Sequence, residues 1–111
     1  MSKDEIELAS QRTKAKVQYN RETGVLWVDW RQCAHRFPSL VRAVERFHAG
    51  LPLTEAHRNL LSGVLWSWAQ WHADTPERAH YAKRLTWHNV VTRDTIQRIL
   101  DELRAWGLDV F

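Results

Sequence analysis

The sequence has one cysteine, three prolines and four glycines among its 111 residues. A single cysteine, Cys33, excludes a disulfide within the chain, and so few prolines and glycines leave no room for a flexible linker between domains. No apolar run approaches the ~18 residues of a membrane span, and no apolar segment follows Met1 as in a signal peptide. These features predict one domain over residues 1–111, located in the cytoplasm and without a membrane segment.

Signatures of catalysis and of metal binding are also missing. The chain has no glycine-rich phosphate loop, no G-x-S-x-G turn and no H-E-x-x-H motif. His72, His80 and His88 recur every eight residues, but no cysteine or carboxylate accompanies them at a ligand spacing. Cys33 and His35 stand two positions apart, which on a helix points their side chains away from each other, so we expect Cys33 to be a small core residue. The sequence therefore predicts a non-catalytic protein without a metal or cofactor.

Tryptophan and basic residues are what the chain has in excess. Seven tryptophans are more than a core of this size readily hides. The formal net charge is +3, and basic residues outnumber acidic ones by eight to three between residues 12 and 46. Such clusters suit a phosphate backbone, but they are also typical of an ordinary solvated surface. The composition leaves nucleic acid and protein open as alternative partners.

The N-terminal quarter predicts a tail followed by a β-hairpin. Residues 1–12 lack a sustained apolar pattern, which is typical of a loose terminus. Within residues 15–28, two runs rich in β-forming residues flank a five-residue connection that ends at Gly24. Since glycine accepts the positive φ that closes such a turn, this pattern predicts a hairpin.

Residues 29–50 predict a helical pair. Asp29 is a suitable N-cap for the first helix, Pro38 interrupts the pattern, and Gly50 ends the second helix. The apolar stripes of the two helices stay nearly in phase. A single kinked helix is therefore an alternative.

Residues 54–108 predict a three-helix core. The longest helix, residues 55–72, has the broad apolar face of a central helix. The last helix ends at Gly107, and Leu108 can fold back as in a Schellman motif. Each helix is preceded by a threonine at its N-cap position: Thr54, Thr75 and Thr92. The predicted fold is thus mainly α, with an N-terminal β-hairpin and four to five helices.

The last predicted helix and its exit carry a family resemblance. Residues 92–103, followed by Trp106, Gly107 and Leu108, are similar to the recognition helix of helix-turn-helix and winged-helix DNA-binding domains, and Ala82 matches a small residue of those families. The resemblance implies a small transcription regulator that binds double-stranded DNA. It also implies a dimer, because one short helix contacts too few base pairs for useful specificity. The donors that it places at the DNA are Thr92, Arg93, Thr95, Gln97, Arg98, Lys83 and Arg84. Since Arg93 and Arg98 lie off the apolar stripe, we expect neither to matter much for stability.

A second hypothesis, a compact protein-interaction module such as an inhibitor or adaptor, comes from Trp66. On a helical wheel Trp66 lies nearly opposite the apolar face that includes Val64 and Trp68. A large aromatic residue among small and amide residues predicts a second packing surface. The helices over residues 29–49, another protein or a second copy of the chain are the alternatives for covering it. The predicted interface residues are Trp66, Gly63 and Gln70.

Overall fold

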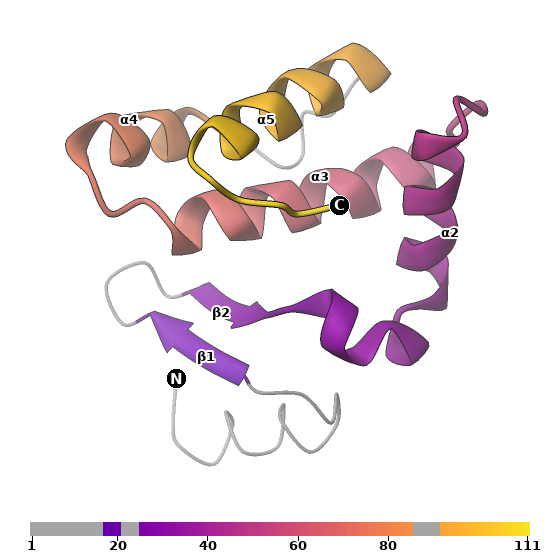
Figure 1. The fold of residues 1–111 in the computed structure, drawn as a ribbon, viewed down its shortest axis with the longest axis horizontal. Coiled ribbons are helices and arrows are strands. Elements are labelled where there is room, and N and C mark those ends of the chain that lie inside the picture. Colours follow the sequence, from indigo (N-terminus) through magenta and orange to yellow (C-terminus); the bar gives the residue numbers. More distant parts are fainter. Residues whose placement is uncertain (1–16, 21–24, 86–91) are drawn as a thin grey trace.

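The computed structural model describes residues 17–20, 25–85 and 92–111, and this part of the chain is mainly helical (Figure 1). Two short strands, β1 (Val17–Asn20) and β2 (Val25–Val28), pair antiparallel with Val17 opposite Val28. The helices are η1 (Trp30–Arg36), α2 (Pro38–His48), α3 (Glu55–Trp71), α4 (Pro76–Arg84) and α5 (Arg93–Ala105). The predicted tail and Gly24 lie outside the described residues, so the hairpin turn stays a prediction.

The predicted helical pair is two separate helices. The carboxylate of Asp29 accepts a hydrogen bond from the backbone N–H of Arg31 at 3.1 Å, which confirms the predicted N-cap. η1 is a 3₁₀ helix rather than an α-helix, and Cys33 inside it has non-helical angles, φ −137° and ψ 37°. α2 then begins at Pro38, whose fixed φ and missing N–H suit the first turn of a helix. The chain direction changes at Phe37, so the single kinked helix is excluded.

α2 ends where the sequence predicts, at Gly50. This glycine has φ 71°, a conformation that other residues rarely adopt. Its N–H donates to the carbonyl of Phe47, and the N–H of Leu51 donates to the carbonyl of Arg46. These two bonds form a Schellman motif.

The caps of the three C-terminal helices are confirmed. The hydroxyls of Thr54, Thr75 and Thr92 each accept a hydrogen bond from the backbone N–H three residues later. At the other end of α5, Gly107 has φ 88° and the N–H of Leu108 donates to the carbonyl of Leu103 at 3.0 Å. The predicted Schellman ending of the last helix is therefore also confirmed.

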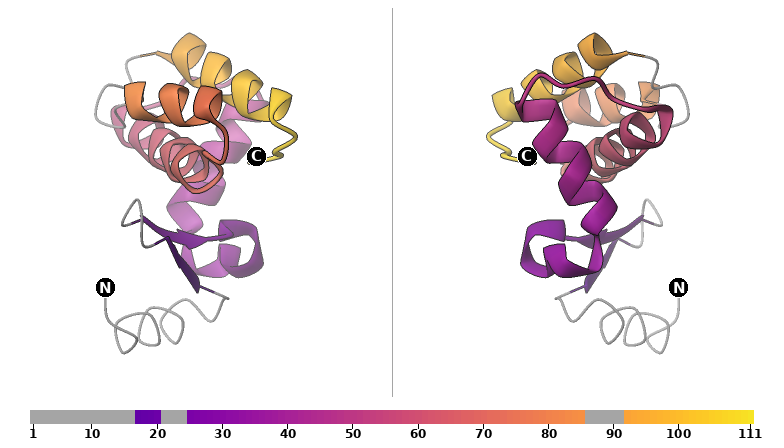
Figure 2. Two further views of the ribbon diagram at one scale, coloured as in Figure 1. Left: turned by 90° about the vertical axis from the view of Figure 1, so that its left-hand side faces the viewer. Right: turned by 90° about the vertical axis from the view of Figure 1, so that its right-hand side faces the viewer.

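α3 is the central element of the fold. It contacts α2, α4, α5 and β2. Figures 1 and 2 show α4 and α5 on one side of α3, with the strands and η1 on the opposite side. The largest fully buried side chains come mainly from α3 and α5: Leu61, Leu65, Ile96, Leu100 and Leu103.

The residues after α5 return to the core. Val110 and Phe111 are buried, and the Phe111 ring lies edge-on to the Phe47 ring of α2, with 5.6 Å between their centroids. The indole N–H of Trp30 donates to the carbonyl of Val110 at 3.0 Å. This C-terminal tail thus links η1, α2 and α5, an arrangement that the sequence did not predict.

Candidate functional site

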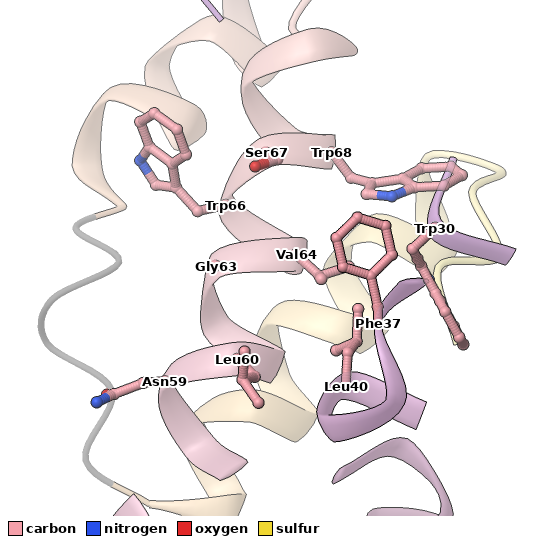
Figure 3. Close-up of a pocket in the computed structure, with 10 residues that line it drawn as sticks. All are labelled: Trp30, Phe37, Leu40, Asn59, Leu60, Gly63, Val64, Trp66, Ser67 and Trp68. Carbon is pink, nitrogen blue, oxygen red and sulfur yellow. The ribbon is translucent and has the colours of Figure 1, made fainter. Parts of the chain in front are cut away.

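An apolar hollow of about 370 Å³ opens at the surface of α3 (Figure 3). In the figure, Phe37, Val64 and Trp68 lie on one side of α3, while Asn59 and Trp66 extend from its other side. Gly63 between them has no side chain to fill the space. We call this feature the aromatic hollow. It is lined by Trp30, Phe37, Leu40, Asn59, Leu60, Gly63, Val64, Trp66, Ser67 and Trp68.

The wall formed by η1, α2 and Trp68 of α3 is held in place by the core. The Trp30 indole is fixed through its hydrogen bond to Val110, so its N–H is already used. Trp68 and Leu40 are buried, and the guanidinium of Arg31 lies 5.8 Å from the centroid of the Trp68 ring. The wall is therefore formed before any ligand arrives, and binding there costs little side-chain entropy.

Leu60 is the exposed part of the lining. Its exposed fraction is 37%, and only Leu51, at 46%, is a more exposed large apolar residue among those whose burial is described. Leu51 lies in the connection between α2 and α3 and does not line the hollow. The two leucines therefore provide a matched pair, one inside the candidate site and one outside it.

The three predicted interface residues divide between two roles. Trp66 is half-buried and, with Gly63, lines the hollow. Gln70 instead donates from its side-chain amide to the carbonyl of Ala82 at 2.7 Å, which joins α3 to α4. The helices over residues 29–49 supply another part of the lining of the hollow, through Trp30, Phe37 and Leu40 (Figure 3).

Arg93 bonds to another part of the fold, which its position off the apolar stripe did not predict. Its guanidinium donates to the carbonyl of Phe47 at 2.8 Å and to the carbonyl of Leu51, and it lies 5.2 Å from the centroid of the Phe47 ring. It thus joins the start of α5 to the end of α2. Arg93 lies off the buried stripe of α5, as the helical wheel predicted, but the sequence gave no sign that the end of α2 packs beside Arg93.

The other predicted DNA contacts divide by whether they already have a hydrogen-bond partner in the described part of the chain. Thr92 caps α5, its hydroxyl lies 3.1 Å from that of Thr95, and the Gln97 amide donates to Asp101 at 2.8 Å. The remaining three residues are exposed, and the described part of the chain gives them no hydrogen bond or ion pair: Lys83, Arg84 and Arg98. Only these three basic side chains of the predicted set are available to an outside partner.

Cys33 is a buried core residue, as predicted, and His35 is exposed. The Cys33 thiol lies 3.8 Å from the carbonyl oxygen of Asp29. Burial raises the pKa of the Cys33 thiol above its ordinary value, and the nearby Asp29 carboxylate raises it further. The thiol is therefore held in its protonated form, which is the unreactive one.

His72, at the end of α3, is expected to make the stability of the protein depend on pH. Burial lowers the pKa of His72 below its ordinary value of 6.5, with Asp74 opposing this shift and Arg78 adding to it. The unfolded chain consequently binds more protons than the folded one as the pH falls below 6.5. We expect the free energy of unfolding to fall on acidification from pH 7 to pH 5, measured by urea denaturation.

The control for this expectation is His72→Gln, which removes the titrating group. The free energy of unfolding of the variant should depend less steeply on pH than that of the natural chain, because the variant lacks the imidazole. The contributions of all other groups cancel when the two slopes are subtracted, so the difference belongs to His72. Equal slopes for the two chains would show that His72 does not cause it.

Neither a metal site nor a membrane span is found within residues 17–20, 25–85 and 92–111. No three histidine, cysteine, aspartate or glutamate side chains gather there as a set of metal ligands. In the same part of the chain, no helix combines the length and the apolar character that crossing a bilayer requires. His88 lies outside the described residues.

Comparison of the chain with protein-family models, with curated protein sequences and with solved structures finds no match. Function is therefore inferred from the residues and their arrangement.

Proposed function

We propose that this chain is a non-catalytic protein-interaction module that binds a partner protein through the aromatic hollow. The observation that carries the proposal is the hollow itself, an open apolar concavity with tryptophan and phenylalanine walls and an exposed leucine. The side chains that dominate binding energy at interfaces are mostly large aromatic residues and arginines, gathered around pockets that exclude water. The excess of tryptophan in the sequence fits this function.

The rigidity of the wall supports the same function. Trp30 and Trp68 are held by a hydrogen bond and by burial, so a partner would meet a surface that needs no rearrangement. Binding to such a surface loses less conformational entropy than binding to mobile side chains, which leaves more of the hydrophobic gain as affinity.

Leu60→Glu tests the proposal, with Leu51→Glu as the control of equal charge change. Immobilised natural chain and Leu51→Glu should retain the same proteins from a lysate of the source organism, whereas Leu60→Glu should lose them. Both leucines are partly exposed, so both variants should keep the circular dichroism spectrum and melting temperature of the natural chain. Retention of the same proteins by Leu60→Glu would contradict a role for the hollow.

A second candidate function, binding of double-stranded DNA with α5 as the reader, is favoured by the three exposed basic residues Lys83, Arg84 and Arg98. The field around them is weak, because residues 54–111 hold seven basic and seven acidic side chains. Fluorescence anisotropy with random duplex DNA tests this function. If the chain binds DNA, the affinity should fall steeply as the salt concentration rises. Arg98→Ala should weaken the binding free energy by about 1–3 kcal/mol if that arginine contacts a base.

A further inference from the structure

The part of α3 that lines the aromatic hollow carries no charge. Residues 59–71 include no lysine, arginine, histidine, aspartate or glutamate. A surface helix normally places charged and polar residues on the face that points away from the core. α2, α4, α5 and β2 all contact α3, and the hollow opens on the side that they leave uncovered. An uncharged helix face at an opening of this kind is typical of a surface that packs against another protein.

Five of the lining residues are arranged symmetrically about Gly63. Leu60 and Trp66 lie three positions before and after it, and Asn59 and Ser67 lie four positions before and after it. Because residues three and four positions apart are neighbours on a helix surface, these five form one strip, which we call the α3 strip. Figure 3 shows Gly63 between the turn of Asn59 and Leu60 and the turn of Trp66 and Ser67. Across Gly63, an apolar residue thus matches an apolar one and a polar residue matches a polar one.

From this symmetry, and resting on the proposed function, we propose that the partner at the aromatic hollow is a second copy of the chain. The two α3 helices run antiparallel about a two-fold axis at Gly63. Every contact in such an interface occurs twice, so Leu60 of each copy packs on Trp66 of the other. Gly63 has no side chain, which lets the two backbones approach closely at the axis.

The polar residues of the α3 strip gain partners in the same arrangement. Asn59 is exposed and Ser67 is half-buried, and within the residues that the structure describes neither side chain forms a hydrogen bond. Antiparallel pairing places the Asn59 amide of one copy opposite the Ser67 hydroxyl of the other. Since an amide N–H donates readily to a hydroxyl oxygen, the two-fold axis yields two equivalent hydrogen bonds.

The absence of charge is what a self-pairing surface requires. A two-fold axis brings the same patch of both copies together, so a charged residue near the axis would face its own equivalent or be buried without a counter-charge. Residues 59–71 avoid both costs. The ten lining residues are fewer than the roughly 20–30 residues on each side of a standard interface. We therefore expect a weak dimer, with a Kd on the order of 10 μM.

Sedimentation equilibrium of the full chain tests the second copy, at concentrations from about tenfold below to about tenfold above that Kd. The natural chain should pass from monomer to dimer over this range. Leu51→Glu, the control outside the hollow, should do so with the same Kd. Leu60→Glu should weaken the dimer by at least about a hundredfold, because it buries two carboxylates without counter-charges. Circular dichroism spectra of all three chains should be alike, since both leucines are partly exposed.

Disulfide linking tests the antiparallel register. Under mild oxidation, an equal mixture of Asn59→Cys and Ser67→Cys chains should form the mixed linked dimer, because these two positions face each other across the axis. Each variant alone should link with itself much more slowly. The natural Cys33 is buried and can stay in place, and Leu51→Cys is the control that should not link. Intact-mass spectrometry distinguishes the mixed dimer from the two homodimers.

The outcomes separate this inference from the proposed function. A natural chain that stays monomeric, while capture of a partner still depends on Leu60, would overturn the second copy and leave the hollow as a site for a different protein. A dimer that Leu60→Glu does not weaken would overturn it too, because the two copies would then meet elsewhere. Self-linking of Asn59→Cys and of Ser67→Cys in preference to the mixed dimer would refute the antiparallel arrangement. A monomer without any capture that depends on Leu60 would contradict both proposals.

Discussion

Replacing Phe111 by alanine is expected to lower the free energy of unfolding by about 3–5 kcal/mol, the cost of truncating a buried aromatic residue. The Phe111 ring is only 7% exposed and packs against the rings of Phe47 and His48. Its loss leaves a cavity between the C-terminal tail and α2 that rigid helices cannot close. Urea denaturation followed by far-ultraviolet circular dichroism measures the change.

Asp109→Ala is the control in the same tail. The Asp109 side chain is 80% exposed, and among the described residues it pairs with Arg31 alone, so its loss should cost less than about 1 kcal/mol. A Phe111→Ala variant as stable as Asp109→Ala would show that the tail does not belong to the core. Because Trp30 is bonded to Val110, the Phe111 variant should also loosen the wall of the aromatic hollow.

Arg93→Ala is expected to lower the free energy of unfolding by about 2 kcal/mol, since hydrogen bonds to a charged group contribute about 1.5–3 kcal/mol. The substitution leaves two backbone carbonyls without their donor from α5, that of Phe47 in α2 and that of Leu51 in the connection after it. Arg93→Lys should recover less than half of the loss, because an ammonium group does not reproduce the planar, forked guanidinium. Thermal and urea denaturation give both values.

Arg98→Ala is the matched control for Arg93, on the same helix and exposed. It should change stability by no more than about 0.5 kcal/mol, as surface substitutions usually do. If Arg93→Ala proved as stable as the natural chain and instead lost DNA affinity, the role in the fold would be refuted. A role of α5 as a DNA recognition helix would then be favoured again.

Helix starts and stops were predictable because each depends on neighbouring residues. The Thr54, Thr75 and Thr92 caps bond the N–H three residues later, and the endings at Gly50 and Gly107 involve at most six consecutive residues. Such contacts depend on side-chain type and on the freedom of glycine to adopt positive φ. The 3₁₀ form of η1, which contains the buried Cys33 with its non-helical angles, was not predicted from the neighbouring residues.

The candidate site was predictable only in part. Trp66 and Gly63 were recognised because a tryptophan beside a glycine on a polar helix face is unusual. The opposite wall was missed, although Trp30 and Phe37 share one apolar stripe of their own segment. Periodicity shows that a stripe is buried, but it does not show which helix covers it or where the covering stays incomplete.

The sequence by itself determined a mainly helical chain, the limits of its helices, the burial of Cys33 and the presence of an unusual aromatic surface on α3. Only the tertiary structure decided the role of Arg93, the return of Phe111 to the core and the shape of the aromatic hollow. The Arg93 bond to Phe47 spans 46 residues, and the Trp30 bond to Val110 spans 80. Contacts of that separation have no local signature in the sequence, because they arise only when independently formed helices pack together and bury their apolar faces.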